Sequence, residues 1–233
     1  MNGAIGMGAD GITRENLKER VIDVLRPAKP WQPDVLLARG DRETVVVKDY
    51  RRRGFLYRFF VGLPSTWNEF RMYRRLEGLE GIPRCAGRID RYALAIEFIE
   101  GRNASAFQPG QLPGEFFDRL RRIVDAVHAR NVVICDLRNK KNVMVTPDGR
   151  PVLIDLCTAF GRGRFWNPLR TWLFGVFYQD DLLGVAKLKR HLAPDLLTPE
   201  EDRKLTEGLF LQREAMAVRD FCVRWLKKLV ARP

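Results

Sequence analysis

Asp136, Asn142 and Asp155 lie within one short stretch of the sequence, residues 128–155. In that stretch Asp148-Gly149 separates two apolar runs, which predicts a hairpin with a two-residue turn and positive φ at both turn residues. In that register Asn142 lies opposite Asp155, with the two Cβ atoms about 5 Å apart. Asp136 lies on the loop that leads into the hairpin. Because Mg²⁺ binds one or two protein carboxylates together with water and substrate phosphates, this stretch predicts a magnesium site.

The preceding elements are expected to supply a small antiparallel sheet and a helix. Residues 34–38 and 44–48 are predicted to be strands. The second of these is rich in β-branched residues, which favour strands, and Lys48 is its last residue. Apolar residues at helical spacing predict a helix over residues 65–76, with Glu69 beside the apolar stripe. A carboxylate there is costly to bury unpaired, so we expect it to have a cationic partner. Residues 92–99 form an apolar strand interrupted by Glu97.

The N-terminal region is expected to lie outside this sheet. Gly6 to Gly11 match the pattern G-x-G-x-x-G, but no strand precedes them, so residues 1–12 are interpreted as a flexible terminus. Thr13 is a good N-cap for a helix whose apolar face continues to Leu25, and Pro27 ends it.

Composition and charge narrow the class of protein. The 233 residues are 45% hydrophobic and 30% charged, which is typical of a globular chain with one core or two small lobes. Lys and Arg exceed Asp and Glu by 41 to 29, a net charge of +12. This excess indicates a polyanionic partner, which could be nucleic acid, an anionic membrane or a phosphorylated substrate. The alternative is that the positive charge serves only the solubility of the surface. Nucleic acid is the least expected of these partners because the basic residues are dispersed and no recognition module is evident.

Cysteine usage and hydropathy predict a cytoplasmic protein. The four cysteines show no C-x-x-C spacing, so neither a zinc site nor a disulfide framework is indicated, and a reducing compartment is the default. No apolar run approaches the roughly 20 residues of a membrane span, and no signal segment opens the chain.

The order of the polar residues resembles that of the protein-kinase-like phosphotransferases, in which a strand Lys pairs with a helix Glu and contacts ATP phosphates. The resemblance covers residues 34–160 and implies an α+β, two-lobed protein-kinase-like fold with a small antiparallel-sheet N-lobe and a reduced, mainly helical C-lobe. The lobes would be residues 34–101 and 102–233, after a terminus and helix at 1–33, with the catalytic loop at 134–157. The matching motifs are Val45-Val46-Val47-Lys48 for V-A-I-K, Asp136-Leu137 for the catalytic D-L, Asn142 for the metal-binding Asn, and Ile154-Asp155-Leu156 for the start of D-F-G.

The resemblance also implies roles for these residues, with ATP and Mg²⁺ as cofactors. Asp136 would be the base that accepts the proton of the acceptor hydroxyl, and Asn142 and Asp155 would be the Mg²⁺ ligands. The cofactor-binding residues would be Lys48, Glu69, Glu97 and Phe98.

Several departures from the family pattern favour an alternative, a nucleotide-binding pseudokinase scaffold. Ile134-Cys135-Asp136 replaces H-R-D, and the loop from Asp136 to Asn142 is one residue longer than in D-L-x-x-x-N. The Gly of D-F-G is replaced by Cys157, and Gly40 is the one glycine between the first two predicted strands, where a glycine-rich loop is expected.

Within the superfamily the sequence is most similar to the small bacterial lipopolysaccharide core sugar kinases and the RIO-type atypical kinases, the former through segments 70–83 and 181–197. The first implies a sugar or lipid-linked acceptor at the cytoplasmic face of the inner membrane, and the second a protein acceptor. Residues 162–174 mix Arg with Trp and Phe, which fits an anionic membrane surface or a helix packed on the core.

Overall fold

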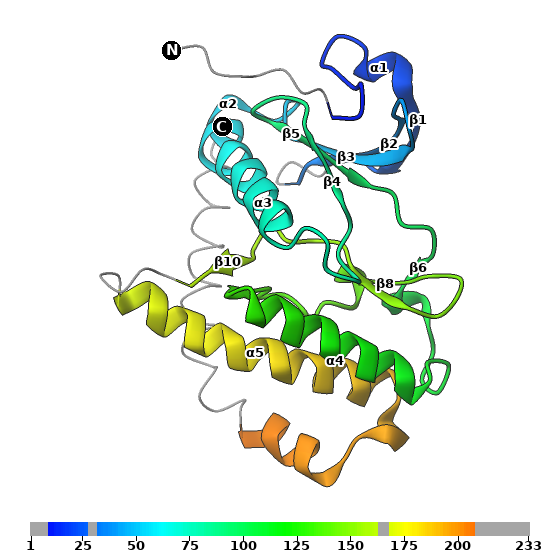
Figure 1. Cartoon of the computed structure of the whole chain (residues 1–233), viewed down its shortest axis with the longest axis vertical. Coiled ribbons are helices and arrows are strands. Elements are labelled where there is room, and N and C mark those ends of the chain that lie inside the picture. Colours follow the sequence, from blue (N-terminus) through cyan, green and yellow to red (C-terminus); the bar gives the residue numbers. More distant parts are fainter. Residues whose placement is uncertain (1–8, 28–31, 163–167, 208–233) are drawn as a thin grey trace. The chain divides into compact units, whose positions relative to one another are not determined.

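The computed structural model describes residues 9–27, 32–162 and 168–207 (Figure 1). These residues form two compact units. The first contains the described residues up to Glu77 together with Pro83–Phe98, and the second contains Gly78–Ile82 and the described residues from Ile99 onward.

The first unit is built on a five-stranded antiparallel sheet with the strand order β1-β2-β3-β5-β4. Val45 and Val47 alternate with less buried residues on the central strand and are fully buried, because successive side chains of a strand point to opposite faces. The strands are β1 (Val21–Arg26), β2 (Asp34–Arg39), β3 (Thr44–Asp49), β4 (Cys85–Arg88) and β5 (Ala93–Glu97).

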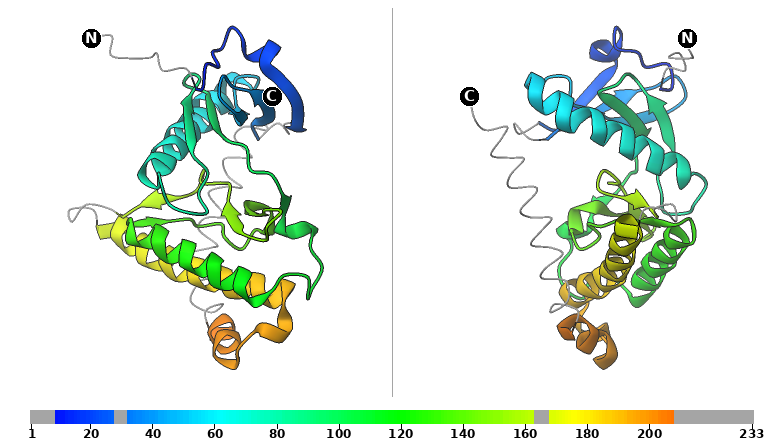
Figure 2. Two further views of the ribbon diagram at one scale, coloured as in Figure 1. Left: turned by 45° about the vertical axis from the view of Figure 1, so that its right-hand side comes forward. Right: turned by 90° about the vertical axis from the view of Figure 1, so that its left-hand side faces the viewer.

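Helical turns follow β3 without interruption from residue 55 to residue 75. They comprise α2 (Phe55–Tyr57), the π-helix η1 (Arg58–Gly62) and α3 (Leu63–Arg75). The predicted helix over residues 65–76 is therefore confirmed, although it begins earlier. α3 contacts β4 and β5 and lies against the sheet (Figure 2). Its buried side chains are those of Thr66, Glu69, Met72 and Tyr73, which recur at helical spacing.

The predicted helix from Thr13 to Leu25 is wrong for most of its length. Only α1 (Leu17–Arg20) is helical, and residues 21–26 form the edge strand β1. The Thr13 cap exists, since Asn16 N donates to Thr13 Oγ1 at 3.4 Å and Thr13 N donates to Asn16 Oδ1 at 2.8 Å. Beyond Arg20 the backbone pairs with β2, beginning with Val21 opposite Ala38. β-branched residues at 21, 22 and 24 fit that pairing, so tertiary contacts override the helical spacing.

The expectation of a flexible terminus is also wrong for residues 9–12, while residues 1–8 lie outside the described residues. Ala9 and Ile12 have no exposed surface and belong to the core of the first unit. Asp10 Oδ2 accepts hydrogen bonds from the backbone N–H groups of Arg42 and Glu43, at 3.2 and 3.1 Å. The segment thus caps the turn between β2 and β3.

The extra strand changes the position of Lys48, which lies on the third strand of the sheet and not on the second. The turn at Gly40 therefore joins the second and third strands. A Cβ at Gly40 would lie 2.1 Å from Asp10 Oδ2, so this glycine makes room for the N-terminal segment. The connection between the first two strands is instead residues 27–33, which contain no glycine and lie partly outside the described residues.

The second unit is mainly helical, as predicted for the C-terminal part. α4 (Gly114–Ala129) and α5 (Pro168–Leu192) contact each other and run side by side (Figures 1 and 2). Beside them lie a three-stranded sheet of order β6-β8-β9 and a two-stranded ladder of β7 with β10. The strands are β6 (Arg102–Asn103), β7 (Val132–Val133), β8 (Val143–Val145), β9 (Pro151–Leu153) and β10 (Phe160–Gly161), and the 3-10 turns are η2 (Ala104–Ala106), η3 (Lys140–Asn142) and η4 (Pro194–Leu196).

None of the helices in the described ranges is both long enough and apolar enough to cross a membrane. This includes α5, the longest of them at 25 residues.

Candidate functional site

The Lys48 ammonium and the Glu69 carboxylate form a buried ion pair within the first unit. Lys48 Nζ lies 2.5 Å from Glu69 Oε1, and the two side chains are 9% and 1% exposed. The pair joins the central strand β3 to helix α3. The cationic partner expected for Glu69 is therefore Lys48, at a separation of 21 residues in the sequence.

Glu97 and Phe98, the other two predicted nucleotide contacts, lie at the end of β5. Glu97 is opposite Val45, and its Oε2 accepts a hydrogen bond from Arg84 N at 2.8 Å. Phe98 N donates to Thr44 O at 3.3 Å, and the Phe98 side chain is 37% exposed. These bonds tie the last residues of the strand to both neighbouring strands.

In the second unit, Asp136 and Asn142 are in direct contact despite the extra residue between them. Asn142 Nδ2 donates to Asp136 Oδ2 and to Asp136 O, both at 3.1 Å. The turn η3 absorbs the longer loop, because Asn139 caps it by accepting a hydrogen bond from Lys141 N at 3.2 Å. The side chain of Asn142 therefore lies within hydrogen-bond distance of the Asp136 carboxylate.

The predicted hairpin register is wrong by one residue. Val143 lies opposite Leu153 and Ile154 N donates to Asn142 O at 3.0 Å, so Asn142 faces Ile154 and not Asp155. The turn has three residues, between Thr146 and Arg150, which are hydrogen bonded at 3.0 Å. Only Gly149 of these has positive φ, 79°. Three-residue turns with a left-handed glycine compete with the two-residue type, and the sequence pattern did not distinguish them.

Asp155 nevertheless comes directly after the residue that pairs with Asn142. Its Oδ1 accepts a hydrogen bond from Cys157 N at 3.2 Å, which orients the carboxylate. The amide of Asn142 is oriented too, because its Nδ2 donates to Asp136 and its Oδ1 accepts a hydrogen bond from Asn139 Nδ2 at 3.2 Å. One carboxylate and one amide oxygen fit Mg²⁺, which completes its shell with water and substrate phosphates. Within the described ranges no group of three or more His, Cys, Asp or Glu side chains has metal-binding geometry.

Asp181 is a buried residue that positions the loop before Asp136, and the sequence did not reveal it. It lies on α5, 1% exposed, and accepts hydrogen bonds from Ile134 N at 2.7 Å and Cys135 N at 2.9 Å. His128 Nε2 lies 3.0 Å from the same carboxylate. Burial raises the pKa of Asp181, and the hydrogen bonds from His128, Ile134 and Cys135 oppose that rise. The available signal was an acidic pair, Asp180-Asp181, in a helix whose other charged residues are all basic.

These contacts explain how the loop tolerates Ile134-Cys135 in place of His-Arg. The bonds to Asp181 use backbone N–H groups, which do not depend on the side chain. Cys135 has a φ of 70°, so the chain turns sharply just before Asp136. His128 is 7% exposed and stacks on Tyr178 with ring centroids 4.0 Å apart, so its ring packs between α4 and α5.

Replacing Asp181 by Asn is expected to lower the free energy of unfolding by about 2–3 kcal/mol, because the new amide N–H₂ faces a buried N–H donor. Asp202→Asn, an exposed acid of the same unit, is the matched control and is expected to change stability little. Urea unfolding of both variants measures the difference. Equal stabilities would show that the Asp181 carboxylate does not hold the loop.

A basic group lies beside the same loop. Leu137 packs closely on α5, since a Cβ at Gly184 would lie 3.1 Å from Leu137 Cβ. On the same face of α5, Lys187 Nζ lies 3.7 Å from Asp180 Oδ1. Burial lowers the pKa of Lys187, and the positive charge of Arg138 also lowers it, while Asp180 opposes both effects.

The aromatic and basic segment 162–174 is described in part, since residues 163–167 lie outside the described ranges. Phe174 is 9% exposed and packs with Val133 and Cys135. Arg170 Nε donates to Gly161 O at 3.0 Å. For these two residues the structure favours the alternative of a helix packed on the core, although Trp172 is 59% exposed.

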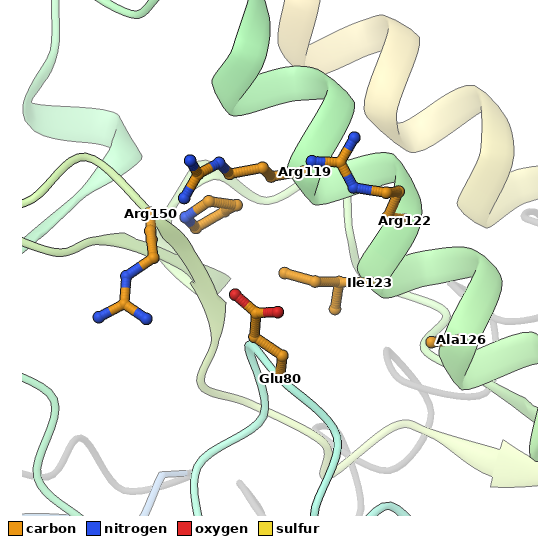
Figure 3. Close-up of a pocket in the computed structure, with 7 residues that line it drawn as sticks. Glu80, Arg119, Arg122, Ile123, Ala126 and Arg150 are labelled. Carbon is orange, nitrogen blue, oxygen red and sulfur yellow. The ribbon is translucent and has the colours of Figure 1, made fainter.

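A separate groove of about 490 Å³ in the second unit contains none of the predicted site residues. In Figure 3, arginines from α4 and from the β8–β9 hairpin surround it, and Glu80 approaches from the connection between α3 and β4. Arg119 and Arg150 already pair with Glu115 and Asp148, so the groove has little excess charge.

Comparisons with known proteins identify the fold but not a family. No protein-family model matches the sequence, and no curated protein matches it. Among solved structures, the chain is similar to the Rio2 kinase from Chaetomium thermophilum, with a TM-score of 0.54 and 12% identity over 83% of this chain and 74% of that one. A complex of the same kinase with ADP/Mg²⁺ and phosphoaspartate gives a TM-score of 0.49 and 12% identity, over 84% and 72% of the two chains.

The ion pair between Lys48 on β3 and Glu69 on α3 agrees with the pairing of a strand Lys with a helix Glu that the sequence resemblance implies. The chain has a protein-kinase-like fold.

Proposed function

We propose that this protein is a Mg-ATP-dependent phosphotransferase that transfers a phosphoryl group to a hydroxyl. The observation that carries the proposal is the contact between Asp136 and Asn142 in a loop fixed by the buried Asp181. Phosphoryl transfer depends mainly on positioning and on charge neutralisation, and a rigid loop provides the first.

Each residue then has a chemical task. The acceptor oxygen attacks the γ-phosphorus of ATP, its proton passes to the Asp136 carboxylate, and the bond between the γ-phosphorus and the bridging oxygen of the β-phosphate breaks to release ADP. Asn142 and Asp155 would hold Mg²⁺, which would neutralise charge on the phosphates. Lys48, oriented by Glu69, contacts a phosphate oxygen, and Glu97 and Phe98 contact the nucleotide.

The proposal also concerns the chemical class of the acceptor. The structural likeness to Rio2 kinase supports a protein acceptor, as in an atypical serine/threonine kinase, more than a sugar of the lipopolysaccharide core. Arg138 beside Asp136 and Lys187 on the adjacent face of α5 favour an acceptor that already carries negative charge. Such charge is found in phosphorylated proteins and in phosphorylated sugars.

The test is label transfer from γ-labelled ATP in Mg²⁺ to a protein mixture and, separately, to purified lipopolysaccharide. Label in protein supports the atypical kinase, and label in lipopolysaccharide supports the sugar kinase. Nucleotide binding without transfer to either acceptor would support the pseudokinase scaffold, which the missing His-Arg and glycine hinge favour, and would overturn the proposed activity.

Replacing Asp155 by Asn is expected to raise the Mg²⁺ concentration for half-maximal activity roughly tenfold or more, because a neutral amide is a weaker ligand for a hard cation. A Mg²⁺ titration of the transfer rate measures it. Asp148→Asn, at the exposed turn of the same hairpin, is the control and should leave the titration unchanged. Coincident Mg²⁺ curves for Asp155→Asn and the parent protein would remove Asp155 from the metal site.

A further inference from the structure

The first unit carries a group of exposed aromatic and apolar side chains that the phosphotransfer proposal does not use. They belong to α2, η1 and the first turns of α3, and we call them the aromatic face; α2 and α3 are labelled in Figure 1. Large exposed apolar patches usually mark a surface that binds a partner or a membrane. The side chains of the aromatic face are Phe55, Leu56, Phe59, Phe60 and Trp67, which are 68%, 56%, 50%, 64% and 50% exposed.

The phenylalanines of the aromatic face form one cluster. Phe55 and Phe59 stack with ring centroids 6.2 Å apart, and Phe59 meets Phe60 edge-on at 5.2 Å. Isolated exposed apolar residues need no explanation, but a contiguous group of this size does.

The opposite side of the same helical segment is packed. Tyr57 is 8% exposed and lies 6.4 Å from the ring of Tyr50. A Cβ at Gly62 would lie 2.9 Å from Tyr50 Cβ, so the helix approaches this tyrosine closely. The segment is therefore amphipathic, with one side anchored to the sheet and the aromatic side turned outward.

The segment that contains the aromatic face is rich in arginine. Residues 51–76 contain seven arginines and one carboxylate, Glu69, which is buried against Lys48. Arg52 is exposed, and the Arg51 side chain is 55% exposed with Asp90 at 3.5 Å. Arg53 and Arg74 pair with Asp34 and Glu77.

Trp67 is an exposed aromatic residue that also lies close to positive charge. Its ring is half exposed, and the guanidinium groups of Arg71 and Arg88 lie over it at 6.0 and 5.3 Å from its centroid. At a bilayer surface, Trp rings lie at the depth of the headgroups and Arg side chains reach the lipid phosphates.

We propose that the aromatic face docks on an anionic phospholipid bilayer. The phenylalanines would enter the boundary between headgroups and acyl chains, as the apolar side of an interfacial helix does. The arginines would be attracted by the negative surface potential of the leaflet. A protein partner that buried this face would have to supply apolar surface and a matching acidic rim together. The docking is independent of phosphotransfer.

The test is co-sedimentation of the full chain with phosphatidylcholine vesicles, with and without phosphatidylglycerol. We expect binding only to the vesicles with phosphatidylglycerol, and weaker binding as salt is raised. The double variant Phe55→Ala/Phe60→Ala is expected to lower the partition coefficient roughly tenfold or more, since two large apolar groups no longer enter the bilayer.

The matched control is Ile22→Ala/Leu25→Ala, which removes two exposed apolar side chains from the edge strand β1 of the same unit. It should bind vesicles as the parent does, and both double variants should keep the parent unfolding temperature because the replaced groups are exposed. Absence of binding to anionic vesicles, or equal partition of the two double variants, would overturn the proposal. It would also be overturned by a vesicle-free dimer, seen by sedimentation velocity and lost in Phe55→Ala/Phe60→Ala, because the face would then bind a second copy.

Discussion

Replacing Asp136 by Asn is expected to lower the transfer rate by a factor of roughly 10² to 10⁴, because the amide cannot accept the proton of the acceptor hydroxyl. The substitution preserves the shape of the loop, since an Asn carbonyl oxygen can accept the hydrogen bond that Asn142 Nδ2 donates to Asp136 Oδ2. Asp136→Ala removes this bond as well and is expected to abolish transfer. Steady-state rates at saturating ATP and acceptor measure the effect.

Two controls separate chemistry from folding. Nucleotide affinity of Asp136→Asn, measured by calorimetry, should stay within a few-fold of the parent value, because Asp136 contacts the acceptor and not the nucleotide. Asp125→Asn, an exposed acid on α4, should retain full turnover. Retention of most of the turnover by Asp136→Asn would exclude Asp136 as the base.

The second large effect is expected at the buried pair of Lys48 and Glu69. Replacing Lys48 by Met leaves the Glu69 carboxylate, 1% exposed, without the ammonium at 2.5 Å. Breaking a buried ion pair in this way typically lowers the free energy of unfolding by about 3–5 kcal/mol. Glu69→Leu is expected to have a similar effect, because it leaves the ammonium buried.

The double variant Lys48→Met/Glu69→Leu distinguishes the structural role of the pair from its role in binding. Apolar residues of similar volume can replace a buried ion pair with little loss, so the double variant should recover most of the stability lost in each single variant. Its transfer activity should remain lost, because no ammonium is left to contact a phosphate.

Denaturant unfolding and transfer rates are measured for the parent protein, Lys48→Met, Glu69→Leu and the double variant. Recovery of activity together with stability would show that Lys48 is only structural. Additive losses of stability in the double variant would contradict the coupling of the two side chains.

The sequence predicted the elements whose signals are local. The β-branched run 44–48 is a strand, and the apolar spacing of 65–76 is a helix. In each case neighbouring residues supply most of the stabilising contacts, so a short window contains the necessary information.

Predictions failed where two conformations were locally similar in free energy. Residues 21–26 have helical spacing and β-branched residues at once, and pairing with β2 selected the strand. The sequence around Asp148-Gly149 is compatible with a hairpin turn of two or of three residues. The pairing of Val143 with Leu153 requires the three-residue turn. A shift of one residue changes which side chains face each other, so the position of Asn142 opposite Ile154 was not predictable from the turn alone.

The sequence by itself determined which residues are available for chemistry and their order: a strand Lys, a helix Glu, then Asp136, Asn142 and Asp155. Only the tertiary structure decided that Lys48 and Glu69 are paired and buried, that Asn142 bonds to Asp136 across the longer loop, and that Asp181 holds that loop. The reason is physical. A hydrogen bond or ion pair between residues 21 or 47 positions apart forms only after packing has removed both groups from water, and no short window of sequence records that packing.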